Sequence, residues 1–91
     1  MYLAESTKGY RKSFKRISRH KHFSQTEFKK VLDLLCSGDT LPDSYKDHQL
    51  RGNFKKYREC HIQNDILLMY QKIDDVLILL LVNIGSHSEL F

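Results

Sequence analysis

Hydrophobic residues recur along this chain at two different spacings. Between residues 8 and 35 they recur every three or four positions, which is typical of amphipathic helices. After residue 53 they come in runs of strand length, separated by short polar segments. The pattern therefore predicts helices in the first half and strands in the second, with a short strand at Tyr2–Thr7 before the helices.

Two helices are predicted. The first, Lys8–Arg19, has apolar residues on one side and basic residues on the others. The second begins at Ser24, because Ser24-Gln25-Thr26-Glu27 has the form of a capping box and Phe23 and Phe28 can form a hydrophobic staple. Gly38 is placed to end this helix in a left-handed turn.

Three strands are predicted after a loop around the only proline, at Phe54–Ile62, Ile66–Lys72 and Val76–Ile84. Short polar turns join them, so they form an antiparallel meander. The last is almost uniformly apolar, as expected of a central strand that is buried on both faces. The fold class is α+β, in the order β-α-α-β-β-β: a small antiparallel sheet with two N-terminal helices on one face and the other face open.

Length and charge narrow the possible functions. The 91 residues predict a single domain, 1–91, too small for a deep enclosed pocket, so an active site should be an open groove suited to a polymer. Residues 1–30 hold nine Lys or Arg and two Glu, a net charge of +7. This basic half indicates a nucleic acid or an acidic protein as partner, although a solvated helix face would have the same composition.

Several classes of protein are not indicated. The longest apolar run has seven residues, so no membrane span is predicted, and there is no signal-peptide pattern. Cys36 and Cys60 are interpreted as buried thiols of a reducing cytoplasm. No CxxC or HxxxH pair occurs, so neither a metal nor a cofactor is predicted.

Three of the five histidines are candidates for chemistry. Strand alternation places Glu59 and His61 on the open face, and His48 and His87 flank the strands at either end. Imidazoles titrate near neutrality and can move the two protons of RNA cleavage without a metal, although scattered histidines are often separate surface residues. Arg58, on the other side of the same strand, would face the helices and would need a partner to be buried there. The run Arg19-His20-Lys21-His22 is interpreted as a solvated helix end without a role in chemistry.

Four segments in order resemble the YafQ-type branch of the RelE/ParE toxin superfamily: Lys46-Asp47-His48-Gln49-Leu50-Arg51-Gly52-Asn53-Phe54, Tyr57-Arg58-Glu59-Cys60-His61-Ile62, Asp65-Ile66-Leu67-Leu68-Met69-Tyr70 and Gly85-Ser86-His87-Ser88-Glu89-Leu90-Phe91. The resemblance implies a RelE-like toxin that cuts messenger RNA on the ribosome and forms a hetero-oligomer with its antitoxin. It implies four catalytic residues, His48, His61, Asp65 and His87, with Glu59 and the terminal aromatic Phe91 in support.

Two positions depart from the family pattern. Ile66 stands where an aromatic is common, and Asn83 stands where many members have an arginine that would stabilise transition-state charge. Arg51, Lys55 or Lys56 could supply that charge instead. Two other functions stay open: inhibition of DNA gyrase, as in the ParE branch, and binding of nucleic acid without catalysis.

Overall fold

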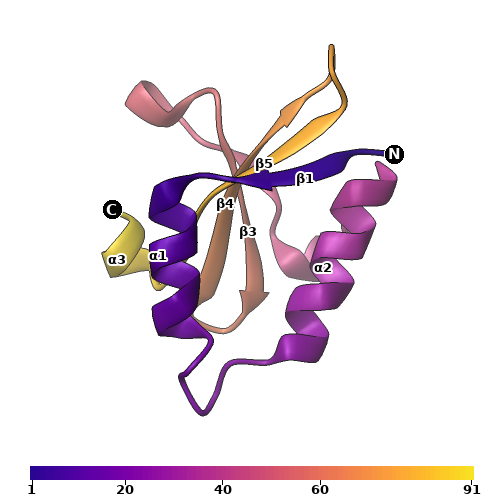
Figure 1. The fold of residues 1–91 in the computed structure, drawn as a ribbon. Helices are drawn as coiled ribbons and strands as arrows, with labels where there is room; N and C mark the ends of the chain where they lie inside the picture. Colours follow the sequence, from indigo (N-terminus) through magenta and orange to yellow (C-terminus); the bar gives the residue numbers. More distant parts are fainter.

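Five strands form one mixed sheet in the computed structural model, which describes residues 1–91. Their order across the sheet is β1-β5-β4-β3-β2 (Figure 1). The elements are β1 (Leu3–Ser6), α1 (Lys8–Ile17), α2 (Gln25–Ser37), η1 (Asp43–Tyr45), β2 (His48–Gln49), η2 (Gly52–Phe54), β3 (Arg58–Gln63), β4 (Ile66–Ile73), β5 (Ile78–Gly85) and α3 (His87–Leu90). The α+β class and the predicted order of the main elements are therefore confirmed.

The sheet differs from the prediction in three details. It is mixed rather than antiparallel, because β1 pairs in parallel with β5. β4, not β5, is the central strand, and its first five residues are all buried. β3 starts at Arg58 rather than Phe54, because the preceding residues form the 3₁₀ turn η2, and Val76 lies in a turn before β5.

Helices α1 and α2 lie side by side over one face of the sheet (Figure 1). Their apolar side chains meet those of β3, β4 and β5 in one core, which contains Tyr10, Ile17, Phe28, Val31, Leu35, Cys60, Leu68, Tyr70, Leu79 and Ile84. The predicted boundaries of α2 are confirmed. The Ser24 side chain accepts a hydrogen bond from the Glu27 N–H, and Gly38 adopts the left-handed conformation with φ of 81°.

The opposite face of the sheet is partly covered by two short segments, η2 and the C-terminal helix α3. The Phe54 ring of η2 meets the terminal Phe91 ring edge to face, with 5.4 Å between centroids. Leu67 and Met69 of β4 are nearly fully buried, although by strand alternation they lie opposite the core face. This face also carries His48 and Glu59, which are partners across β2 and β3. No helix has the length and apolarity needed to cross a membrane.

Candidate functional site

His48 and Glu59 form an ion-pair contact on the face opposite the helices. They are direct partners in the β2–β3 register, and His61 follows Glu59 on the same side of β3. The His48 Nε2 lies 3.6 Å from Glu59 Oε1. Glu59 is only 4% exposed, and its second oxygen, Oε2, has no hydrogen-bond partner. A buried carboxylate with an unused oxygen is costly unless it attracts a cation or a proton donor.

The other ring nitrogen of His48 fixes which nitrogen carries the first proton. Its Nδ1 lies 2.7 Å from the carbonyl oxygen of Lys46, which can only accept, so Nδ1 carries hydrogen. Nε2 therefore faces Glu59 with its lone pair when the ring is neutral. A second proton on Nε2 converts the contact into an ion pair, so this geometry suits a histidine that gains a proton during the reaction.

His87 is the first residue of the C-terminal helix α3. Its ring lies 5.2 Å from that of Phe91, which in turn meets Phe54. Helix α3 is short, but a complete capping box holds it: Ser86 Oγ accepts from the Glu89 N–H, and Glu89 Oε1 accepts from the Ser86 N–H at 2.8 Å. The other Glu89 oxygen pairs with Arg16 of α1 at 3.0 Å. The hydrogen bonds from Ser86, with a smaller effect of Arg16, lower the pKa of Glu89.

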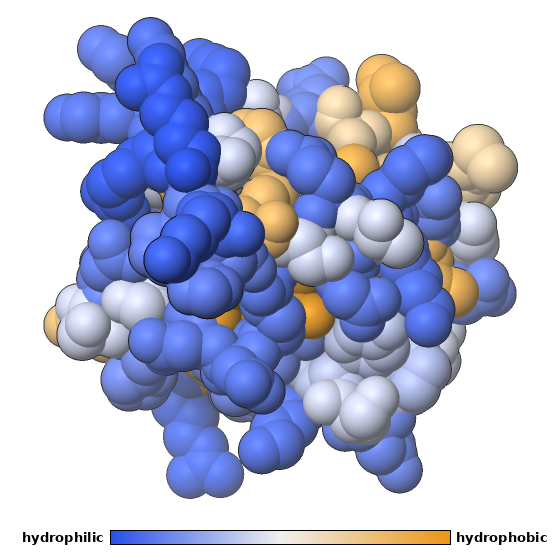
Figure 2. Space-filling view, turned by 90° about the horizontal axis from the view of Figure 1, so that it is seen from below, coloured by the Kyte–Doolittle hydropathy of each residue, from blue (hydrophilic) through white to orange (hydrophobic).

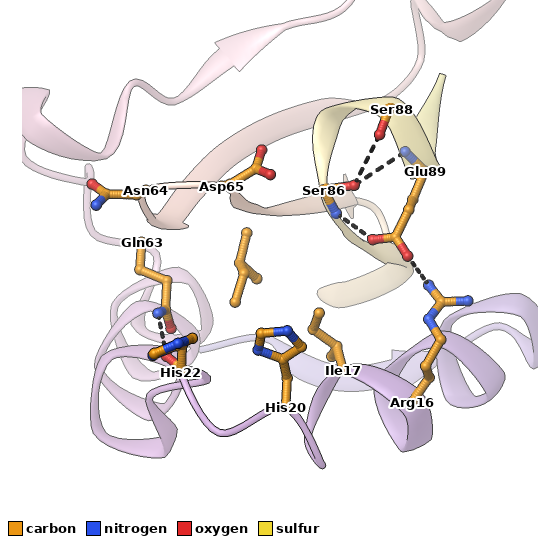
Figure 3. A pocket seen from close by; sticks show the side chains of 11 residues that line it. Arg16, Ile17, His20, His22, Gln63, Asn64, Asp65, Ser86, Ser88 and Glu89 are labelled. Atoms are coloured by element: carbon orange, nitrogen blue, oxygen red, sulfur yellow. Dashed lines mark hydrogen bonds and ion pairs between the residues drawn. The ribbon is translucent and has the colours of Figure 1, made fainter.

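Asp65 lies at a different place from the pair of His48 and Glu59. It occupies the β3–β4 turn and lines an open pocket of about 860 Å³ with Ser86, Ser88 and Glu89 (Figure 3). His61 lines a second, smaller hollow of about 310 Å³. Asn64 lines both, so the β3–β4 turn separates the two spaces. The predicted residues thus lie along one end of the sheet and its open face, in three small groups.

Arg58 has the partner that the sequence could not name. Its guanidinium donates to both Asp47 oxygens, at 3.4 and 3.1 Å, and the fully buried Tyr70 hydroxyl also donates to Asp47. Burial first, and then the bond to Asp47, raise the pKa of Tyr70, so its hydroxyl keeps its proton. Because Asp47 directly precedes His48, this network anchors the start of β2. Sequence reasoning missed Asp47 and Tyr70, although the unpaired Arg58 was a signal that such a partner existed.

The proposed sources of positive charge lie around η2. Arg51, Lys55 and Lys56 are all exposed, and the Lys56 ammonium lies 5.3 Å from the centre of the Tyr57 ring. Asn83, at the position of the missing arginine, pairs with Met69 across the strands, and its side-chain oxygen accepts from the N–H of Ile84 at 2.9 Å. The exposed positive charges proposed to replace that arginine therefore flank η2, whereas Asn83 on β5 carries none.

No group of three or more His, Cys, Asp or Glu side chains is arranged to hold a metal ion. Both cysteines are free thiols. Burial above all, with the neighbouring Asp47 and Glu59 charges, raises the pKa of Cys60 to about 12, so it is a core residue rather than a nucleophile.

The run Arg19-His20-Lys21-His22 follows α1 and is exposed, in agreement with its interpretation as solvated, but two of its histidines also line a pocket. His20 and His22 stand over the larger pocket, opposite Asn64 and Asp65 (Figure 3). Their positions depend on a loop that folds back onto the β3–β4 turn, which no local pattern reveals. The underside of the molecule, seen in Figure 2, is mostly hydrophilic, with apolar atoms visible only in small spots.

Comparisons with known proteins give one consistent result. Residues 2–91 match the family model described as the bacterial YafQ toxin of type II toxin–antitoxin systems. The mRNA interferase toxin YafQ of Escherichia coli K12 is 34% identical over 77 residues, which are 84% of this chain and 82% of that protein. A metal-bound toxin from Helicobacter pylori is 40% identical, with a TM-score of 0.90 and full coverage of both chains. The E. coli DinJ–YafQ complex is 29% identical, with a TM-score of 0.87 over 100% of this chain and 99% of that one.

Proposed function

The chain belongs to the YafQ family of toxins of type II toxin–antitoxin systems, and from this membership we propose that it is an endoribonuclease that cuts messenger RNA on the ribosome without a metal ion. The observation that carries the chemistry is the pair of His48 and the buried Glu59 on an open face of the sheet. We propose that residues 1–91 act as one toxin domain in the cytoplasm, where messages are translated.

In this proposal the ribose 2′-OH attacks the adjacent phosphorus as it loses its proton to His48 or His61. The new O–P bond closes a 2′,3′-cyclic phosphate, and the bond to the 5′-oxygen breaks. His87 gives its proton to that 5′-oxygen, which leaves as a hydroxyl. His87 sits on α3, beyond β5, whereas His48 and His61 belong to β2 and β3. Attack and departure occur on opposite sides of phosphorus, so the acid and the base must come from different segments.

Glu59 gives His48 an advantage as the base. A proton taken up at Nε2 makes the ring a cation within 3.6 Å of a carboxylate that solvent barely reaches. The Glu59 carboxylate thus gives the half-exposed His48 ring an ion-pair partner at the nitrogen that takes up the proton. Asp65 orients an imidazole or the substrate from the β3–β4 turn, Phe91 supports a base, and Arg51, Lys55 or Lys56 offsets phosphate charge.

Translating ribosomes with purified toxin test this assignment. His87→Ala should slow cleavage by roughly 10²–10⁴-fold while ribosome binding stays near the parent value, because only the transition state uses that proton. Asp75→Ala, an exposed change in the β4–β5 turn, serves as the control and should cut normally. A His87→Ala variant that cuts at the parent rate would remove this residue from the mechanism.

Two further measurements separate the alternatives. The product should carry a 2′,3′-cyclic phosphate, and cleavage should continue in excess chelator when ribosome integrity is controlled. Loss of activity that one added metal restores would contradict the metal-free reaction. A supercoiling defect with intact message would instead indicate a gyrase inhibitor, and neither effect would indicate a binding module.

We also propose that an antitoxin is the protein partner, since the E. coli relative has been crystallised with DinJ. The exposed basic residues of α1 suit an acidic peptide that is disordered when free and folds on binding. No membrane partner is proposed.

A further inference from the structure

The larger pocket is built from three separate segments of the chain. One wall is the end of α1 and the loop after it, with Arg16, His20 and His22; the facing wall is the β3–β4 turn, with Asn64 and Asp65 (Figure 3). The start of α3 closes one side. We propose that this pocket is a subsite for one nucleotide of single-stranded RNA, next to the phosphate that is cut. This inference rests on the proposed nuclease function.

Gln63 holds the loop that carries His20 and His22 in place through two hydrogen bonds. Its side-chain amide donates to the carbonyl of His22 at 2.6 Å, and its side-chain oxygen accepts from the Ser24 N–H at 2.7 Å. One side chain of β3 thus fastens the loop between α1 and α2 to the sheet. The loop backbone is held at both polar ends of the amide, which places His20 and His22 beside the pocket.

An ion pair joins the wall formed by α1 to the side closed by α3. Glu89 links Arg16 of α1 at 3.0 Å to the capping box of α3. Ile17 and Ile66, each 8% exposed, contribute the apolar part of the lining. The pocket therefore combines a fixed polar rim with an apolar base, at a volume of about 860 Å³, which lies within the range of small-ligand sites.

The chemistry of the lining fits a nucleotide better than a simple anion. The rings of His20 and His22 lie 5.7 Å apart and tilted by 45°, so they offer π-faces on which a base can stack and, when protonated, charge for a phosphate. The Asn64 amide, which makes no hydrogen bond within the protein, can both donate to and accept from a base edge. Asp65 is acceptor-only when ionised and repels phosphate, which favours a ribose hydroxyl or base amino group at that end.

The position of the pocket ties it to the reaction. Asp65, one of the proposed catalytic residues, lies on one wall, and Ser86, on the side closed by α3, directly precedes His87. A strand whose nucleotide occupies the pocket would continue past α3 toward His87 and Phe91. Apart from Asp65, the residues of the pocket would then position the message rather than perform chemistry, and they would affect which sequences are cut.

Nuclear magnetic resonance with a trinucleotide whose riboses carry 2′-O-methyl groups tests the inference, because this ligand cannot be cleaved. Binding should shift the imidazole signals of His20 and His22 and the side-chain amide of Asn64. Replacing both histidines with alanine should weaken binding at least about tenfold, since base stacking on two rings is lost. Lys21→Ala removes a charge from the same loop outside the pocket, and it should change binding less than about twofold by loss of a single exposed charge.

The outcomes separate the subsite from the nuclease assignment. If the parent protein binds the trinucleotide at these residues but cuts no message, the proposed function fails and the subsite stands. If it cuts message and the double variant binds and cuts with the parent's affinity and sequence preference, the subsite is refuted. Inorganic phosphate that shifts the same signals and displaces the trinucleotide equally well would reduce the pocket to an anion site and overturn the inference.

Discussion

Removing the Asp47 carboxylate should destabilise the protein more than removing the Tyr70 hydroxyl that it binds. In Asp47→Ala the hydroxyl stays in place, fully buried and without its acceptor, and the half-buried Arg58 loses both hydrogen bonds to Asp47 but keeps the one to Gln49. The orphaned hydroxyl costs about 1–3 kcal/mol and the partly exposed ion pair about 0–1 kcal/mol, so the total loss is about 1–4 kcal/mol. Tyr70→Phe deletes one hydrogen bond and leaves Asp47 paired with Arg58, so it should cost about 1 kcal/mol.

The double variant is the discriminating measurement. Adding Tyr70→Phe to Asp47→Ala removes the orphaned hydroxyl, so the double variant should be more stable than Asp47→Ala alone by about 1 kcal/mol. Urea unfolding followed by circular dichroism gives these differences as shifts of the midpoint at constant slope. Asp39→Ala, an exposed aspartate with no side-chain hydrogen bond, is the control and should lie within about 0.5 kcal/mol of the parent. A double variant less stable than either single variant would refute the reasoning.

Asp47→Ala should also alter the candidate site, because Asp47 directly precedes β2. That strand has only two residues, His48 and Gln49, and the Asp47 network helps to hold it together with its pairing to β3 and the bond from Gln49 to the Lys55 carbonyl. Asp47→Ala should therefore reduce cleavage more than its unfolded fraction explains, and the His48 ring should lose its preference for a proton on Nδ1. An unchanged nitrogen spectrum of His48 would show that the network supports stability alone.

Three further predictions concern charge and burial. Hydrogen bonds to Ser86 lower the pKa of Glu89, so Glu89 stabilises α3 fully above the ordinary glutamate pKa of 4.5 and stops doing so as pH falls through the lowered pKa. The amide signal of Ser86 should therefore titrate with a midpoint below pH 4.5. A midpoint at or above pH 4.5 would contradict this prediction. A maleimide should label half-buried Cys36 in the native protein and spare Cys60, whose thiol pKa burial raises to about 12; equal labelling would indicate an opened core. The complex with the antitoxin should weaken as salt rises, whereas salt-independent affinity would argue against a role for the basic face of α1.

Local sequence determined most of the fold. The helix boundaries follow from short-range chemistry: the Ser24 cap, the phenylalanines on either side of it and a glycine able to adopt positive φ all act within a few residues. The alternation in β3 placed Glu59 and His61 on one face, because side chains of a strand point to opposite sides in turn. The segments quoted for the family resemblance were enough to predict which family the chain belongs to.

Tertiary structure decided what depends on contacts between distant residues. The parallel pairing of β1 with β5 joins residues more than 70 positions apart, and no local pattern encodes which edge of a sheet an N-terminal strand will take. Asp47 became visible as the partner of Arg58 only when β2 lay beside β3. His20 and His22 look like a solvated helix end in the sequence. They line a pocket because Gln63, about 40 residues away, holds their loop against the sheet, and a hydrogen bond of that kind depends on geometry that residue order alone does not specify.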